Sequence, residues 1–373
     1  MGARAKALAA WVRGEALLCC AAVAAGVSMF FVPPSVAYAA YIDLRVLILL
    51  FCLMAVVAGF QACGLFAVLA QRLLAGRKNL RLLLLLLVLL PFFSAMLVTN
   101  DVALITFVPF TILILSLIDR QRYLIPAVVL QTLAANLGSM ATPVGNPQNL
   151  FLYAKYALQM GPFLRAVLPL LGISLLGLCL ACVCVPGEVL QVHFAQRERL
   201  TAPRKLAAYG ALFGLCLLSV FHLLPEAALF LIVIAGVLVC DWRLLGRVDY
   251  SLLATFVCFF IFVGNLGQIG AVREFLARML SGGAMLPAVA ASQVISNVPA
   301  AVLLANFTQD WRGLVMGTNI GGLGTPIASM ASLISLKIYL RSPQARPARY
   351  VAWFLAANAV GLAVLLGAGL LLS

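Results

Sequence analysis

The chain has 373 residues, of which 65% are apolar and 10% are charged, and its mean hydropathy is +1.13. These values lie far from those of soluble globular proteins and predict a polytopic membrane protein. The net charge of +14 does not indicate nucleic acid, because the basic residues cluster between apolar segments, where Lys and Arg mark the cytoplasmic side. We therefore expect the lipid bilayer, and no nucleic acid, as a partner.

Apolar runs of about 20 residues are long enough to cross a bilayer. Such runs begin near Ala16, Leu44, Leu124, Phe163, Leu206, Ala227, Ser251, Gly313 and Tyr350. Pairs of shorter apolar arms lie between Leu80 and Ile118 and between Met285 and Phe307. If all basic clusters face the cytoplasm, each short pair returns to the side it entered. The pattern then predicts nine crossings of the cell (inner) membrane and a cytoplasmic N-terminus.

The first apolar run has two interpretations. Ala37-Tyr38-Ala39 resembles a signal-peptidase site, and Arg4, Lys6 and Arg13 would form the charged region before it. The run from Ala16 to Val32 is longer than a usual signal core, which favours an uncleaved span. Cleavage would leave the remaining topology unchanged.

One unusual phrase occurs twice inside long apolar stretches. Residues 135–144 read ANLGSMATPV and residues 318–327 read TNIGGLGTPI, so both contain Asn-x-Gly-x-x-x-Thr-Pro. Gly and Pro interrupt a helix, and unpaired backbone groups in hydrocarbon cost several kcal/mol each unless protein, water or a ligand satisfies them. Two broken helices at corresponding places in two halves point to a transport site.

The duplication extends beyond this phrase. Spans that open with Asp43 and Asp249 are each followed by an amphipathic arm, a polar triplet between two short apolar arms, and a broken helix. The first span runs inward and the second outward, so the copies are inverted. We expect an all-α fold with two re-entrant hairpins, divided into an N-terminal span and external loop (1–42), a first repeat (43–185), a basic loop and connecting spans (186–248), and a second repeat with the last span (249–373).

Asp101 is the only carboxylate that the sequence places at membrane depth. A buried acid there is a functional hypothesis by default. It could bind sodium, carry a proton or repel anions, or it could simply cap the second hairpin arm, where Asp is favoured. In the second hairpin, Ser296 or Asn297 would cap the helix and Pro299 would suit its first turn. Helix N-termini from both hairpins would create a mildly positive pocket able to hold an anion.

The polar residues of the broken helices offer hard oxygen ligands suited to a small cation. Close helix packing with polar cross-links is the structural alternative. We expect substrate contacts from Thr99, Asn100, Asp101, Thr142, Ser296, Asn297, Val298 and Thr325, and ion coupling through Asp101, Asn100, Asn136, Gly138, Asn146, Asn297, Asn319 and Gly321. Histidine-rich spans, paired acids and a nucleophile with a base are not evident. The sequence therefore predicts no enzyme activity, no cofactor and no metal other than sodium.

At these residues the chain resembles the ion transporter superfamily of arsenite permeases, sodium/proton antiporters and divalent-anion:sodium symporters with a citrate-transporter-like domain. Thr99-Asn100-Asp101-Val102-Ala103 with Pro109 is similar to the arsenite-permease hairpin, and Ser296-Asn297-Val298 lies where the dicarboxylate symporters carry Ser-Asn-Thr. The resemblance implies a carrier, often a homodimer, in which a mobile unit moves against a scaffold. Asp101 and Val298 replace threonines that help hold a substrate carboxylate, which counts against a dicarboxylate.

From these features we expect a secondary transporter of a small inorganic or organic anion, coupled to sodium or protons, that works by elevator-type alternating access. The alternative is a cation/proton antiporter that uses Asp101.

Overall fold

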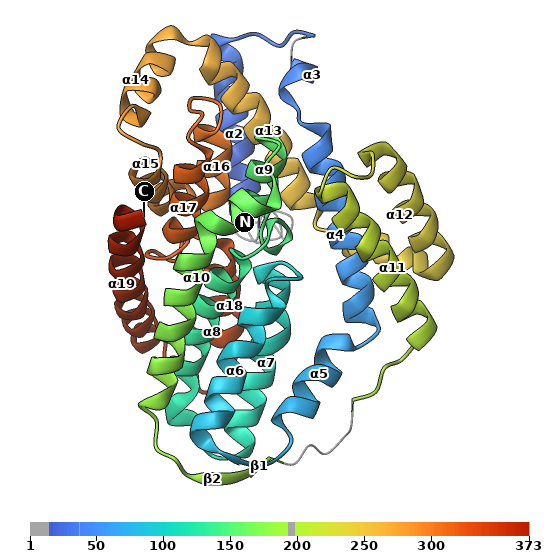
Figure 1. Cartoon of the computed structure of the whole chain (residues 1–373), viewed down its shortest axis with the longest axis vertical. Helices are drawn as coiled ribbons and strands as arrows, with labels where there is room; N and C mark the ends of the chain where they lie inside the picture. The colour runs from blue at the N-terminus through green and yellow to red at the C-terminus, as the bar shows by residue number, and fades with distance from the viewer. Residues whose placement is uncertain (1–14, 37, 193–197, 373) are drawn as a thin grey trace, which may run out of the picture.

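The computed structural model describes residues 15–36, 38–192 and 198–372. Arg4, Lys6, Arg13 and Ala37, which carry the signal-peptide alternative, lie outside these ranges. The described chain is all-α apart from one two-stranded ribbon (Figure 1). Its first-half helices are α2 (Ala16–Phe31), α3 (Tyr38–Tyr41), α4 (Leu44–Ala62), α5 (Leu65–Leu74), α6 (Leu80–Ser94), α7 (Asn100–Leu117), α8 (Leu124–Ser139), α9 (Pro147–Lys155) and α10 (Met160–Val183).

The second half repeats the same order of elements after two connecting helices. The connecting helices are α11 (Pro203–Val220) and α12 (Glu226–Asp241). The second repeat and the last span contain α13 (Tyr250–Gln268), α14 (Gly270–Leu280), α15 (Met285–Ile295), α16 (Asn297–Leu304), α17 (Trp311–Gly321), α18 (Met330–Leu340) and α19 (Pro347–Leu372). All nine expected crossings have a helical counterpart that begins within a few residues of its predicted start. The polytopic all-α fold is thereby confirmed.

Both repeats begin in the same way. The carboxylate of Asp43 accepts a hydrogen bond from the Val46 amide at the start of α4, and Asp249 does the same for the Leu252 amide in α13. An aspartate in this position satisfies an amide that the first helical turn leaves unpaired. The shared acid therefore marks equivalent helix starts in the two copies.

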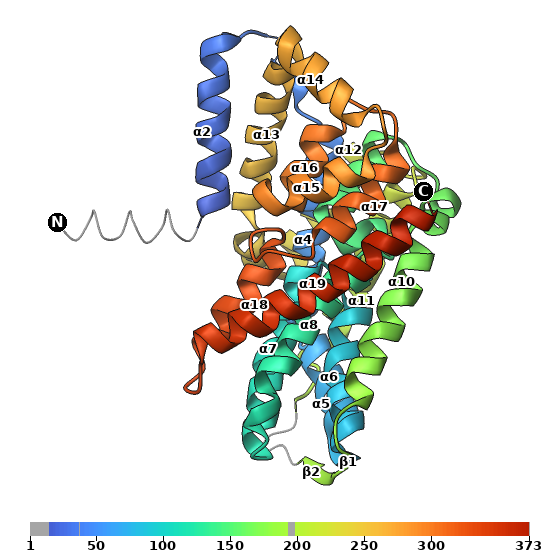
Figure 2. The same cartoon turned by 90° about the vertical axis from the view of Figure 1, so that its left-hand side faces the viewer.

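Six described helices are long and apolar enough to cross a membrane by length and composition, and α7 is one of them. Its length of 18 residues exceeds the short arm predicted from the sequence. In the fold, however, α7 packs back along α6 as the second arm of a hairpin. The hairpin α6–α7 lies at one end of the molecule and the hairpin α15–α16 at the other (Figures 1 and 2). This is the inverted arrangement.

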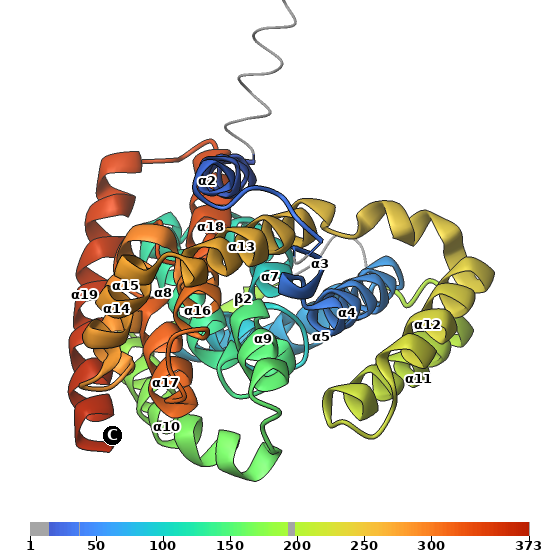
Figure 3. The same cartoon turned by 90° about the horizontal axis from the view of Figure 1, so that it is seen from above.

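The helices other than α3, α5 and α14 form two groups, which contact each other through α4 with α9 and through α13 with α16. The hairpin group contains α6–α10 and α15–α19, and the frame group contains α2, α4, α11, α12 and α13. Within the frame group, α4 packs on α11 and α12, and α2 packs on α13, where Asn265 donates a hydrogen bond to Ser28 over 2.8 Å. Viewed from above, α4, α11 and α12 lie on the side of the molecule away from α19 (Figure 3).

A β-ribbon that the sequence did not predict connects the basic loop to the first hairpin. Strand β1 (Gly76–Asn79) pairs antiparallel with β2 (Val189–Val192), with Gly76 opposite Val192. Beside it Arg120 forms an ion pair with Glu188, and this hydrogen-bonded contact lowers the pKa of Glu188. The described part of the loop is thus attached to the hairpin rather than being a free linker.

Candidate functional site

The two broken helices meet the hairpin tips in the interior of the hairpin group. Helix α8 ends at Ser139, and the chain resumes as α9 at Pro147 after the short helical turn Pro143–Gly145. Helix α17 ends at Gly321, and α18 begins at Met330. The polar residues of the duplicated phrase lie in these interruptions or in the last helical turn before them.

The duplicated glycines allow each broken helix to approach the first arm of its hairpin closely. A Cβ atom on Gly138 would lie 2.0 Å from the backbone oxygen of Phe92 in α6, and one on Gly321 would lie 2.7 Å from the Cβ of Ser292 in α15. Neither distance is compatible with a side chain at the present spacing. The glycines are therefore explained by packing.

The duplicated threonines connect each interruption to the backbone of its hairpin. The hydroxyl of Thr142 donates to the carbonyl of Met96 over 2.5 Å, and that of Thr325 donates to the carbonyl of Gln293 over 3.2 Å. The side chain of Gln293 also donates to the carbonyls of Gly321 and Leu323. Sequence reasoning missed Gln293, although a lone glutamine in the short apolar helix α15 was the available signal.

The duplicated asparagines connect the two halves to each other. Asn136 accepts hydrogen bonds from Asn100 of the first hairpin over 2.9 Å and from Ser329 of the second interruption over 3.0 Å. Asn319 accepts from Asn146 over 3.1 Å and donates to Asn149 over 2.7 Å. All six side chains are buried. Sequence reasoning named four of the six residues in this cross-link as site residues and missed the contributions of Ser329 and Asn149.

A cavity of about 220 Å³ lies beside this network, between the two helix groups. From the hairpin group it is lined by Thr99, Asp101 and Asn146, and from the frame group by the apolar face of α4 and by Arg247 and Asp249. Asp249, which the sequence places only at a span end, thus shares a cavity with Asp101. Arg247 belongs to the basic clusters that the sequence assigns to the cytoplasmic side, and nothing in the sequence indicated its approach to the hairpin tip.

Asp101 does not cap its helix. Helix α7 begins at Asn100, and the backbone amide of Asp101 donates to the Asn100 side chain over 3.0 Å. The Oδ1 atom of Asp101 is buried and has no hydrogen-bond partner among the described residues. A carboxylate oxygen in this state is expensive unless a cation, proton or water reaches it. The side-chain cap is therefore not formed. Asp101 still lies in the first turn of α7, where the helix dipole favours an acid, and it lines the cavity.

The second hairpin tip is arranged differently. The amide of Asn297 and the hydroxyl of Ser296 both donate to the carbonyl of Ala328, so Ser296 provides no side-chain cap for α16. Ser296 has a φ of 74°, in the left-handed region that non-glycine residues rarely adopt. Ser296, Asn297, Val298 and Thr325 do not line the cavity that contains Asp101. The cavity is thus built on the first repeat.

The glycine contact predicts a stability effect. Gly138→Ala is expected to lower the free energy of unfolding by about 1–3 kcal/mol, the usual cost of overpacking a filled interior. Gly172→Ala in α10 is the matched control, because nothing lies within 4 Å of the added Cβ. Thermal unfolding of the purified protein measures both. Equal midpoints for the two variants would contradict the close packing of α8 on α6.

The chain is similar in sequence to membrane proteins and transporters of other organisms. The chain is 34% identical over 325 residues to the Inner membrane protein YbiR of Escherichia coli, covering 85% of both chains. It is 32% identical over 254 residues to the Uncharacterized transporter MJ0456 of Methanocaldococcus jannaschii, covering 68% of this chain and 69% of that protein. A shorter match, 33% over 180 residues, covers 44% of this chain and 36% of the Silicon efflux transporter LSI3 of Oryza sativa subsp. japonica.

The family model described as Citrate transporter matches residues 7–310, which include the first repeat, the connecting spans and the second hairpin. With its hairpins, broken helices and membrane-spanning segments, the chain is a multi-pass membrane transporter that belongs to the citrate transporter family.

Proposed function

We propose that the protein is a secondary transporter of a small anion or oxyanion, coupled to sodium or protons. The cavity that joins the tip of the first hairpin to the frame group carries this proposal. Amide groups, hydroxyl groups and the start of α7 surround the hairpin tip, and such groups bind oxygen-rich anions. The family description names citrate and the name of the rice relative names silicon, so these names favour no single substrate, and the anion class rests on the groups at the hairpin tip.

The charges that line the cavity favour coupling to a cation. When Asp101 and Asp249 are both ionised, they carry two negative charges against one positive charge on Arg247, so an anion that enters alone meets net negative charge. A sodium ion or proton at the unpaired Asp101 oxygen would remove this repulsion. Anion and cation would then bind better together than separately, which is the thermodynamic condition for symport.

A ligand-stabilisation screen of the purified protein tests this proposal. Oxyanions and carboxylates are added with sodium, with lithium or with neither, at several pH values, and the unfolding midpoint is measured. We expect an anion that stabilises the protein only when the coupling cation is present. Stabilisation by the cation alone, with no anion effect in the whole set, would instead favour cation/proton exchange through Asp101, the second candidate.

We propose alternating access by movement of the hairpin group along the frame group. The frame-side wall contributed by α4 consists of Leu50, Leu53, Met54, Val57, Ala58 and Gln61, a largely apolar face along which a neighbouring group can slide. Under the charge-derived topology, Arg247 and Asp249 lie at the cytoplasmic ends of the frame spans. A hairpin tip beside them would be open to the cytoplasm, and the other state would bring it toward Asp43.

A thiol at the hairpin tip reports this movement. Thr99→Cys, in a background without the ten native cysteines, is expected to react with a membrane-impermeant maleimide in inside-out vesicles and, more slowly, in right-side-out vesicles. The two reactivities arise because the same position faces each side in turn. Reaction from one side only, with transport still intact, would contradict movement of the tip across the barrier.

A further inference from the structure

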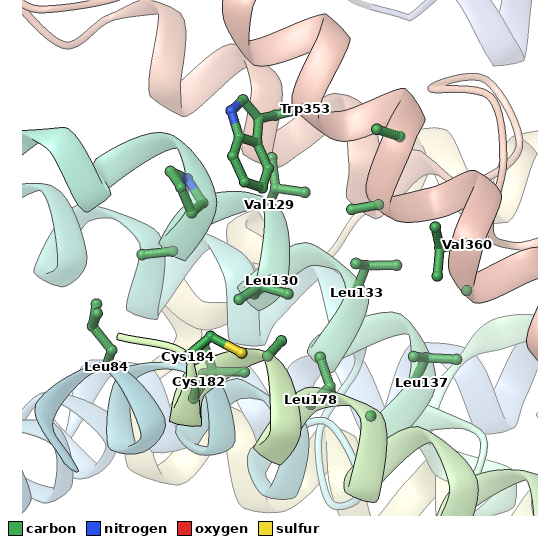
Figure 4. Close-up of a pocket in the computed structure, with 18 of the residues that line it drawn as sticks. Leu84, Val129, Leu130, Leu133, Leu137, Leu178, Cys182, Cys184, Trp353 and Val360 are labelled. Carbon is green, nitrogen blue, oxygen red and sulfur yellow. The ribbon is translucent and has the colours of Figure 1, made fainter. Parts of the chain in front are cut away.

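A second and larger cavity lies on the outside of the hairpin group. It has a volume of about 740 Å³ and is bounded mainly by α8, α10 and α19. Figure 4 shows Leu130, Leu133 and Leu137 of α8 along one wall, with Leu178 of α10 and Val360 of α19 on the facing walls. The helices α10 and α19 lie on the side of the molecule away from α11 and α12 (Figure 3). The cavity is therefore separate from the Asp101 site and opens between helices that a bilayer would surround.

The length of the cavity matches one leaflet. Its α8 wall extends from Tyr123 to Leu137, which is about 21 Å at 1.5 Å per residue along a helix axis. One leaflet of a bilayer, with its headgroup region, is about 20–22 Å thick. Because Tyr123 adjoins the basic segment at 120–122, the cavity runs from the cytoplasmic surface toward the bilayer centre under the charge-derived topology. An acyl chain of the inner leaflet would fit this path.

Under the charge-derived topology, two arginines lie at the cytoplasmic end of the cavity. Arg122, just before α8, and Arg349, in the first turn of α19, both line it, and both are exposed. The Arg122 guanidinium lies 4.7 Å from the ring centroid of Tyr123, and Trp353, which is 46% exposed, follows Arg349 by about one turn of α19 and also lines the cavity. No Asp or Glu lines the cavity among the residues that the structure describes. Arginine beside Tyr and Trp is the combination found at the headgroup level of membranes.

We propose that this groove binds an anionic phospholipid of the cytoplasmic leaflet, with an acyl chain along α8 and the phosphate between Arg122 and Arg349. The apolar wall alone would accept any lipid chain, and the two arginines select a negatively charged headgroup. A second copy of this chain would need an acidic group next to an apolar ridge in order to fill the groove. An anionic phospholipid already carries a negative headgroup and an apolar chain in one molecule. The lipid site is independent of which solute the transporter carries.

Two kinds of variant test the contact with the lipid headgroup and the contact with the acyl chain separately. Arg122→Gln with Arg349→Gln removes the charge, and Gly177→Phe fills the groove, because Gly177 lines it and has open space around its Cβ position. The matched controls are Arg243→Gln with Arg341→Gln, two exposed arginines away from the groove, and Gly172→Phe, an exposed α10 position with the same open surroundings that does not line it.

Native mass spectrometry of the delipidated full chain with phosphatidylglycerol, phosphatidylethanolamine or soluble glycerol phosphate tests the proposal. We expect retained phosphatidylglycerol, about 30-fold weaker binding after loss of both arginines, and no retained lipid in Gly177→Phe, while both controls bind normally. Equal retention of the two phospholipids, equally tight binding of glycerol phosphate, or unchanged lipid binding in Gly177→Phe would each overturn it. So would a wild-type dimer that Gly177→Phe dissociates with no lipid bound to either form.

Discussion

Asp101→Asn is expected to abolish the dependence of anion binding on the coupling cation. Its carboxylate has a buried oxygen with no hydrogen-bond partner in the part of the chain that the structure describes, and it lines the cavity between the two helix groups. Asparagine keeps the size of the side chain but removes the charge that would attract sodium or a proton. Typical coupling between two ligands changes affinity roughly 5- to 150-fold, and in the variant this factor should fall to about one. Anion affinity measured with and without the cation gives the factor directly.

Two other carboxylates serve as controls for this result. Asp119→Asn changes an acid just beyond the other end of α7, outside the cavity, and should leave the coupling factor unchanged. Asp249→Asn removes the second acid of the cavity while Asn preserves the cap of α13, because Asn and Asp are equivalent there. If Asp249→Asn abolishes coupling while Asp101→Asn does not, the cation binds at Asp249 and the role proposed for Asp101 is wrong.

The sequence predicted the helices well because their signals are local. Apolar runs of bilayer length located the spans, and the amphipathic arm predicted after the Asp43 span is helix α5 (Leu65–Leu74). The duplicated phrase located both broken helices, since Gly and Pro interrupt a helix wherever they occur in it. Features that depend on distant segments were not predicted. The pairing of β1 with β2 joins residues more than a hundred positions apart, and the basic residues of β1 indicated only a cytoplasmic loop.

The candidate site shows the same division between local and distant information. The repetition identified the residues that both copies of the phrase share, Asn, Gly and Thr. It could not distinguish residues that pack helices from residues that bind a ligand. In the structure, Gly138 and Thr142 hold α8 and the following loop against the first hairpin. The approach of Arg247 and Asp249 to Asp101 arises from the packing of the frame group on the hairpin group, for which the sequence contains no local signal. Locating the cavity therefore required the three-dimensional structure, whereas most residues of the network beside it were predicted from the sequence.

Asn319→Ala is expected to impair transport more than its effect on stability explains. The Asn319 side chain joins Asn146 and Asn149 across the two interruptions, so its loss leaves buried amide groups of both partners with fewer bonds. Each such group costs about 1–3 kcal/mol when left unsatisfied, and the free energy of unfolding should fall by a similar amount. Because Asn146 also lines the cavity, a displaced Asn146 amide would change the site itself. Transport rate and unfolding midpoint are measured in the same preparations.

Asn265→Ala is the matched control, since it removes an equally buried amide from the frame group. Asn265 donates to Ser28 over 2.8 Å and to Tyr38 over 2.9 Å, and neither partner lines the cavity. Its loss should lower stability comparably while transport persists at temperatures where the protein stays folded. A double-mutant cycle of Asn146→Ala and Asn319→Ala should give a coupling energy of roughly 0.5–3 kcal/mol, as for other contacting pairs. If transport instead follows stability alone in both Asn319→Ala and Asn265→Ala, the cross-link is structural scaffolding, and the binding site must lie on the cavity wall formed by Thr99, Asp101 and the frame group.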